Sequence, residues 1–400
     1  MPTKRIYIFD GTWANRNSNG NPTILNAIVE ILSVPGAYQQ IRYFPGVGTR
    51  YGIVEKYIGG GLGHGAEKDI LEAVDDLATN YSPEDEVIII GYSRGAYIAR
   101  SIVGFLDRLG LPRCDREVLH ELYGKYISGT LLQRGVADRL SVKYNCRRIL
   151  IKSLICIDTV GALGIPRTGI FGLFSIFSPI MKKRKFMETD VASNVEKMFY
   201  AIALREYRGP FQPTLMHVPE NRRDCLKQVY FFGSHTDVGM LREASSPCDF
   251  VLASVLQELR DVGVTLGEEK IHHRFTHAGA NRPFSEMSSH DWLHDSIQPS
   301  FAGLWGLLGR HTRQPGQYVR SGKLTNETIH VTARLRGYGL EPGHPVIDGY
   351  SIEKGPGQTY SWRRDAQGPA TGSSDSENVV SIDEEPFGDY EAFLHGISLV

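Results

Sequence analysis

Residues 86–100 constrain the fold of this chain more than any other part of the sequence. Residues 87–90 are the β-branched run Val-Ile-Ile-Ile, which predicts a strand buried on both faces. Apolar residues then recur at helical spacing over residues 99–106. Between strand and helix lies Gly91-Tyr-Ser-Arg-Gly95, a G-x-S-x-G pattern in the strand–turn–helix setting of a nucleophile elbow. Ser93 is therefore our candidate nucleophile.

The turn around Ser93 requires glycine for a physical reason. A serine on a strained turn needs neighbours without Cβ atoms, because strand and helix pass close to each other there. The helix that follows offers backbone N–H groups and a positive dipole end to a developing oxyanion. We predict that the amide of Arg94 is one oxyanion donor. A second is expected from the turn of Gly11, Thr12 and Trp13, which follows a predicted strand over residues 5–9.

Two later strands end in residues that suit the partners of a serine nucleophile. A strand predicted over residues 149–157 is followed by Asp158, and one over residues 228–232 leads into His235. The order Ser, Asp, His is that of α/β-hydrolases, so Asp158 is predicted to orient the imidazole and His235 to act as general base.

One alternative for these partners stays open at the level of sequence. Asp237 could be the acid in place of Asp158. In that case the base would come later in the chain, with His294 or His330 as candidates.

Composition narrows the class of protein further. The formal net charge of -1 gives no argument for a nucleic-acid partner. The five cysteines are scattered without C-x-x-C pairs, which favours reduced thiols, and no signal-peptide or membrane-spanning pattern occurs in the sequence. We therefore expect a cytoplasmic protein. The pairs His273/His277 and His290/His294 have i, i+4 spacing but lack H-E-x-x-H, so we expect no metal and no cofactor.

Six separated stretches of the chain together resemble one known family. They are Phe9-Asp-Gly-Thr-Trp13, Tyr43-Phe-Pro-Gly-Val-Gly-Thr49, Gly91-Tyr-Ser-Arg-Gly-Ala96, Ile157-Asp-Thr-Val-Gly161, Ala201-Ile-Ala-Leu-Arg-Glu-Tyr-Arg208 and Phe232-Gly-Ser-His-Thr-Asp-Val-Gly239. The set is similar to the catalytic domains of type VI secretion phospholipase effectors of the first lipase class, a family of α/β-hydrolases from bacteria and fungi. The resemblance implies Ser93 as nucleophile and suggests Asp158 and His235 as its partners.

The predicted fold is a single α/β-hydrolase-like domain over residues 1–350, with a mostly parallel sheet flanked by helices. We expect a lid-like insertion at about residues 162–195 and a loosely structured C-terminal region over residues 351–400. A helix is predicted over residues 194–208, because its apolar residues recur at helical spacing.

The expected insertion is unusually apolar. Phe171, Phe174 and Phe177 precede a basic cluster at residues 182–185. The phenylalanines are predicted to bind an apolar substrate under a lid, and peripheral contact of this stretch with a membrane surface is the other interpretation.

The function that follows is that of a serine hydrolase. It would cleave an ester or thioester, of lipid or acyl type, through an acyl-enzyme. Two alternatives use the same fold: a non-catalytic binding or scaffold module, and an acyltransferase with the same triad.

Overall fold

A computed structural model describes most of the chain: residues 2–11, 22–46, 62–160, 190–208, 211–241, 246–277, 311–316, 323–339, 350–356, 359–364 and 380–386. The strands are β1 (Lys4–Phe9), β2 (Gln39–Phe44), β3 (Glu86–Tyr92), β4 (Ile151–Ile157), β5 (Val195–Ala203), β6 (Leu226–Phe231), β7 (Glu327–His330), β8 (Ser351–Lys354), β9 (Tyr360–Arg364) and β10 (Val380–Glu385). The helices are α1 (Ile24–Leu32), α3 (Leu62–Asn80), α4 (Arg94–Leu109), α5 (Arg116–Ile127), α6 (Val136–Lys143), α9 (His235–Gly239), α10 (Ser246–Asp261), α11 (Glu268–His277) and α13 (Val331–Gly339).

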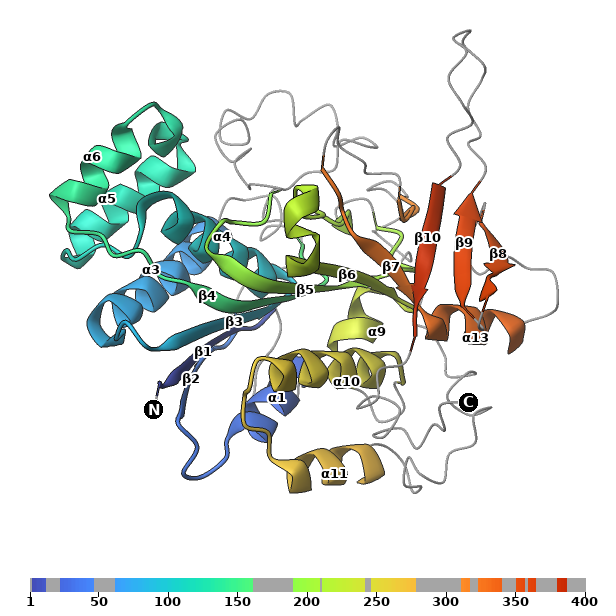
Figure 1. The fold of residues 1–400 in the computed structure, drawn as a ribbon. Coiled ribbons are helices and arrows are strands. Elements are labelled where there is room, and N and C mark those ends of the chain that lie inside the picture. Colours follow the sequence, from blue (N-terminus) through green and yellow to red (C-terminus); the bar gives the residue numbers. More distant parts are fainter. Residues whose placement is uncertain are drawn as a thin grey trace, which may run out of the picture.

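All described strands belong to one sheet, in the order β2-β1-β3-β4-β5-β6-β7-β10-β9-β8. Every pair from β2 to β10 is parallel, and β9 and β8 then add antiparallel (Figure 1). The prediction of a mostly parallel sheet flanked by helices is confirmed. The carboxyl ends of β3, β4, β5 and β6 therefore meet at one edge, where open α/β sheets place functional groups.

Helices cover both faces of the sheet, and each face has its own core. On one face Tyr7 and Ile89 pack with α3, α4 and α5. On the other, Ile6 and Ile88 pack with α1, α10 and α11. Figure 1 shows the two groups of helices on opposite sides of the strands. Because successive side chains of β1 and β3 enter different cores, these strands are continuous apolar runs rather than alternating ones.

The helix predicted over residues 194–208 is wrong, because residues 195–203 form strand β5. This strand pairs with β4 and with β6 in the middle of the sheet. Tyr200 and Ala201 are both fully buried, so its second half has apolar contacts on both faces. A short apolar run of this kind matches a helix face by accident, and periodicity alone cannot separate the two.

The region after residue 350, which we expected to be loosely structured, contributes three strands to the sheet. β10 pairs with β7, and β9 and β8 follow it. Two apolar side chains of these strands, Trp362 of β9 and Ile382 of β10, are buried. Arg334 of α13 pairs with Glu384 of β10. We expected no strands here because the region is polar, but an extension at the edge of a sheet needs few buried side chains.

The lid-like insertion predicted at about residues 162–195 lies almost entirely outside the described residues, which resume at residue 190. In the part of the chain that is described, no helix has the length and apolar character to cross a membrane.

Candidate active site

Ser93 is the single residue between the end of β3 and the start of α4, and its backbone is strained. Its φ is 57° and its ψ is -119°, a conformation that non-glycine residues rarely adopt. A Cβ on Gly95 would lie 1.9 Å from the carbonyl oxygen of Phe9, and one on Gly91 would lie 2.4 Å from that of Gly95. The two glycines are therefore needed for the close approach of strand and helix, as the elbow pattern predicts.

Three predicted side chains meet beside this elbow. The Nε2 of His235 lies 2.9 Å from the Oγ of Ser93, and its Nδ1 lies 2.7 Å from the Oδ2 of Asp158. If Nδ1–H donates to the carboxylate, Nε2 is left to accept the hydrogen of the serine hydroxyl. The three side chains are buried, so water competes little for these contacts.

Asp158 is held as a carboxylate by two other groups besides His235. Its Oδ1 accepts from the backbone N–H of Ala203 at 2.9 Å. The guanidinium of Arg313 donates to both carboxylate oxygens. Burial alone would raise the pKa of Asp158, but the charge of Arg313 and the hydrogen bond from His235 outweigh it and hold that pKa well below its usual value.

Two aromatic rings pack against the imidazole of His235, and two hydrogen bonds hold its backbone. The ring of Tyr92 stacks on it with centroids 5.0 Å apart, and the ring of Phe211 meets it edge-on at 5.0 Å. The Tyr92 hydroxyl donates to the carbonyl of His235 at 3.0 Å. The backbone N–H of His235 donates to Glu206, which Arg208 pairs in turn. Both the ring and its backbone are therefore positioned before any substrate arrives.

The alternative partners lie elsewhere or outside the described residues. Asp237 caps α9, because its Oδ2 accepts from the N–H and the hydroxyl of Ser234 at 2.9 and 2.7 Å. His330 is buried at the end of β7, with its Nδ1 2.8 Å from the hydroxyl of Thr332. His294 is outside the described part of the chain. Of the two acids weighed from the sequence, Asp158 is the one in contact with His235.

The turn after β1 lies beside Ser93, but the amide of Gly11 is used differently from our expectation. A Cβ on Gly11 would lie 3.2 Å from the Cβ of Ser93. However, the N–H of Gly11 donates to the Oδ1 of Asp10 at 2.7 Å, so Gly11 does not offer the oxyanion donor we expected. Asp10 also accepts from the hydroxyls of Thr23 and Tyr43, both at 2.6 Å. Burial raises the pKa of Asp10 against these hydrogen bonds.

Other predicted site residues fall outside the described residues. Thr12 and Trp13 are among them, as are Phe171, Phe174 and Phe177 and the basic cluster at 182–185. Arg94 is the first residue of α4, directly after Ser93. Within the described residues no three histidine, cysteine, aspartate or glutamate side chains gather as metal ligands would.

Sequence reasoning missed Arg313, Phe211 and the role of Glu206. Glu206 belongs to one of the stretches that resemble the family, so it had a signal that we did not interpret. Arg313 had none, because it is a lone arginine in a short polar segment, 155 residues from its partner Asp158. Phe211 likewise lies in no pattern that marks it.

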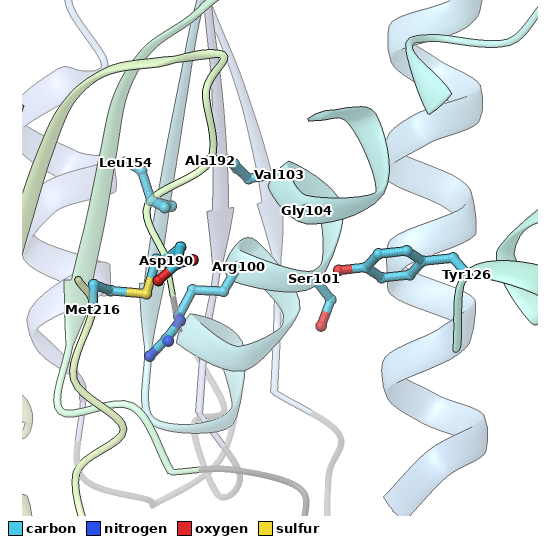
Figure 2. Close-up of a pocket in the computed structure, with 9 residues that line it drawn as sticks. All are labelled: Arg100, Ser101, Val103, Gly104, Tyr126, Leu154, Asp190, Ala192 and Met216. Carbon is cyan, nitrogen blue, oxygen red and sulfur yellow. The ribbon is translucent and has the colours of Figure 1, made fainter. Parts of the chain in front are cut away.

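A separate recess lies along α4, where Arg100, Ser101, Val103 and Gly104 line it (Figure 2). No residue of the Ser93–His235–Asp158 group lines it. Arg100 is buried there, and its Nη1 donates to the carbonyl of Thr214 at 2.6 Å. Within the part of the chain that the structure describes, its Nε and Nη2 have no hydrogen-bond partner. Space beside such donors is suited to water, which commonly satisfies buried polar groups. We assign this recess no substrate.

The sheet order and the elbow define the class of this protein as an α/β-hydrolase. Residues 4–258 match the model of the family described as T6SS, phospholipase effector Tle1-like, catalytic domain. The chain belongs to this family. Phospholipases hydrolyse ester bonds, so the family is one of ester hydrolases. No curated protein matches the chain.

Solved structures that are similar to parts of this chain are distant in sequence. A crystal structure of an uncharacterized protein from Pseudomonas aeruginosa is 16% identical, with a TM-score of 0.41, over 66% of this chain and 46% of that one. The Tle1 effector bound to the VgrG spike of the type 6 secretion system is 17% identical, with a TM-score of 0.33, over 62% and 52%. A putative carboxylesterase from Lactobacillus plantarum is 11% identical, with a TM-score of 0.33, over 66% and 87%. The chain thus spans about half the length of the first two.

Proposed function

We propose that this protein is a serine hydrolase that cleaves an ester of lipid or acyl type through an acyl-enzyme. One observation supports the proposal above all others: the unbroken contact from the Ser93 hydroxyl through the imidazole of His235 to the carboxylate of Asp158. The strained φ of Ser93 supports it as well, because such strain concentrates at functional sites.

The proposed first half-reaction forms the acyl-enzyme. The Nε2 of His235 takes the proton of the Ser93 hydroxyl as its oxygen attacks the ester carbonyl carbon. The carbonyl oxygen becomes an oxyanion, which the backbone N–H of Arg94 and the positive end of α4 stabilise. His235 then gives its proton to the departing alcohol as the carbon–oxygen bond breaks, which leaves Ser93 acylated. Asp158 remains ionised throughout and stabilises the imidazolium.

The second half-reaction repeats this chemistry with water. His235 takes a proton from a water molecule, whose oxygen attacks the acyl carbon of the ester to Ser93. The tetrahedral intermediate collapses, the Ser93 oxygen recovers its proton from His235, and a carboxylic acid leaves. The same steps with an alcohol in place of water would be acyl transfer, so product analysis decides between the two.

The proposed substrate class is a glycerophospholipid or a related acyl ester. Support comes from the family, whose description is that of phospholipase effectors. A further argument is the apolar stretch with Phe171, Phe174 and Phe177, which suits an acyl chain.

Covalent labelling with a fluorophosphonate probe tests the nucleophile and its base. We expect the wild type to label, Ser93→Ala not to label, and His235→Ala to label at least about 100-fold more slowly. Two matched variants serve as controls. Ser101→Ala removes another buried serine of α4, whose hydroxyl donates to the carbonyl of Tyr97, and His330→Gln removes another buried histidine. Both controls should label like the wild type.

Product release tests the substrate class. Phosphatidylcholine vesicles and a p-nitrophenyl ester of a short acid are incubated with wild type and with Ser93→Ala, and free carboxylic acid is measured. Release from both substrates by the wild type alone supports the proposal. Release from the short ester only limits the substrate to other esters. A folded wild type that neither labels nor releases acid refutes the proposal in favour of a binding module.

A further inference from the structure

Arg313 is a fully buried cation that contacts the proposed catalytic acid. Its Nη1 and Nη2 donate to the two carboxylate oxygens of Asp158, the Nη2 contact being 3.2 Å long. The same two nitrogens donate to the carbonyls of Ala203 and Phe211. Neither Arg313 nor Asp158 has any exposed side-chain surface. A buried charge is tolerated only when it is paired and hydrogen-bonded, and these contacts meet that condition at Nη1 and Nη2. Among the described residues, the Nε of Arg313 has no hydrogen-bond partner.

The short segment that carries Arg313 is fastened on both sides. The N–H of His311 donates to the carbonyl of Tyr207 at 2.9 Å, and the N–H of Gly316 donates to the Oε1 of Glu327 at 3.0 Å. This segment lies beyond residue 258, where the match to the family model ends. The site therefore receives a charged group from a part of the chain that the family pattern does not cover.

We propose that Arg313 is a positioning residue of the triad, which fixes the carboxylate of Asp158 and keeps it ionised as the acceptor for the imidazole of His235. The proposal rests on the function proposed above. It follows from two physical effects, one of geometry and one of charge.

The geometric effect comes from the fork of the guanidinium. Arg313 and the N–H of Ala203 together fix the plane of the Asp158 carboxylate, so that Oδ2 faces the Nδ1 of His235 at 2.7 Å. A two-pronged contact restrains rotation of the carboxylate in a way that a single donor cannot. The contact to the Phe211 carbonyl also holds the residue whose ring packs edge-on against the imidazole.

The charge effect acts on Asp158 itself. Burial raises the pKa of this carboxyl, and the positive charge of Arg313 is the largest of the influences that lower it. Without that charge a buried carboxylate would be costly, and a protonated acid is a weaker acceptor for the Nδ1–H of His235.

The test follows the Nδ1–H of His235 directly by NMR, in full-length protein with ¹⁵N-labelled histidine, with the resonance assigned through His235→Gln. We expect a downfield Nδ1–H resonance in the wild type, and in Arg313→Gln its loss together with fluorophosphonate labelling that is about 100-fold slower. Arg313→Lys, which keeps the charge but loses the fork, should keep the resonance and label at a rate between the two.

A second comparison covers the case in which Arg313→Gln does not fold. Arg313→Lys alone then tests the fork, because it keeps the buried charge, and an Arg313→Lys variant that labels at the wild-type rate would overturn the inference. Where Arg313→Gln does fold, a retained Nδ1–H resonance with a wild-type labelling rate would overturn it.

The Nδ1–H resonance and the labelling separate the two proposals. A wild type that labels, with a resonance and a labelling rate that do not respond to loss of Arg313, overturns this inference alone. A folded wild type that does not label overturns the proposed function, and the resonance still decides the role of Arg313 at the imidazole.

Discussion

Replacing Gly239 by alanine should impair the site without touching any residue of the triad. A Cβ at this position would lie 2.0 Å from the Cε2 of Tyr92 and 2.2 Å from its Cζ. Ordinary contact is near 3.5–4.0 Å, so the ring must move by about 1.5 Å. Tyr92 is buried, its ring stacks on His235 and its hydroxyl donates to the carbonyl of that residue. The displacement is therefore passed to the imidazole.

Two magnitudes follow from this overlap. Overpacking of a buried site costs about 1–3 kcal/mol of unfolding free energy. Misplacement of a reacting group by about 1 Å costs about 100-fold in rate. We expect Gly239→Ala to lower the rate of fluorophosphonate labelling by about that factor, and urea unfolding to show a loss within the stated range.

The matched control is Gly124→Ala in α5, where a Cβ would meet nothing within 4 Å. Because alanine favours a helix interior by about 0.5–1 kcal/mol over glycine, this variant should gain stability and label like the wild type. Tyr92→Leu with Gly239→Ala should show strong non-additivity in stability, since the smaller side chain relieves the overlap. Normal stability and labelling of Gly239→Ala, or strict additivity in the pair, would refute the reasoning.

Three further predictions follow from contacts of the site. Asp237→Ala removes the capping contacts to Ser234 and should lower the unfolding free energy by about 1 kcal/mol, while the labelling rate stays within a few-fold of wild type. Asp158→Ala should abolish labelling, and the reverse pattern would make Asp237 the acid. The pKa of Asp158 is lower in the folded state than its unfolded value near 3.9, so its carboxylate stabilises the fold above that value and this contribution is lost as pH falls. In urea titrations, the difference in unfolding free energy between wild type and Asp158→Asn should be constant above about pH 5 and shrink below it. A difference that grows in acid would contradict this sign. Arg313→Met leaves the buried carboxylate of Asp158 without its ion pair and should lower the unfolding free energy by about 3–5 kcal/mol. Asp158→Asn/Arg313→Met should recover part of that loss in the same assay, and additive losses would argue against an ion pair.

Sequence patterns predict the position of a residue best where its neighbours along the chain define it. Ser93, Asp158 and His235 each follow a buried strand, and parallel strands bring such positions to one edge of the sheet. The direction of a single amide was beyond this reasoning: Gly11 lies where expected, yet its N–H is taken by Asp10. Arg313 was beyond it too, because its contact with Asp158 joins distant segments and leaves no local pattern.

The misassigned strand β5 shows a different limit. Its apolar residues match a helical face, and only the pairing with β4 and β6 decides for a strand. That pairing is a property of the assembled sheet. The strands after residue 350 were missed for the related reason that short edge strands need little apolar sequence.

The position of β7 and β10 determines where this chain can be cut. The family match ends at residue 258, but β6 pairs with β7, which comes from residues 327–330. A fragment that stopped near residue 258 would leave β6 as a bare edge, with unpaired backbone groups beside apolar side chains such as Val229 and Phe231. Exposed edges of this kind template the addition of strands from other molecules. We therefore expect such a fragment to aggregate. A fragment that stays in solution should extend at least through β7 and its neighbour β10.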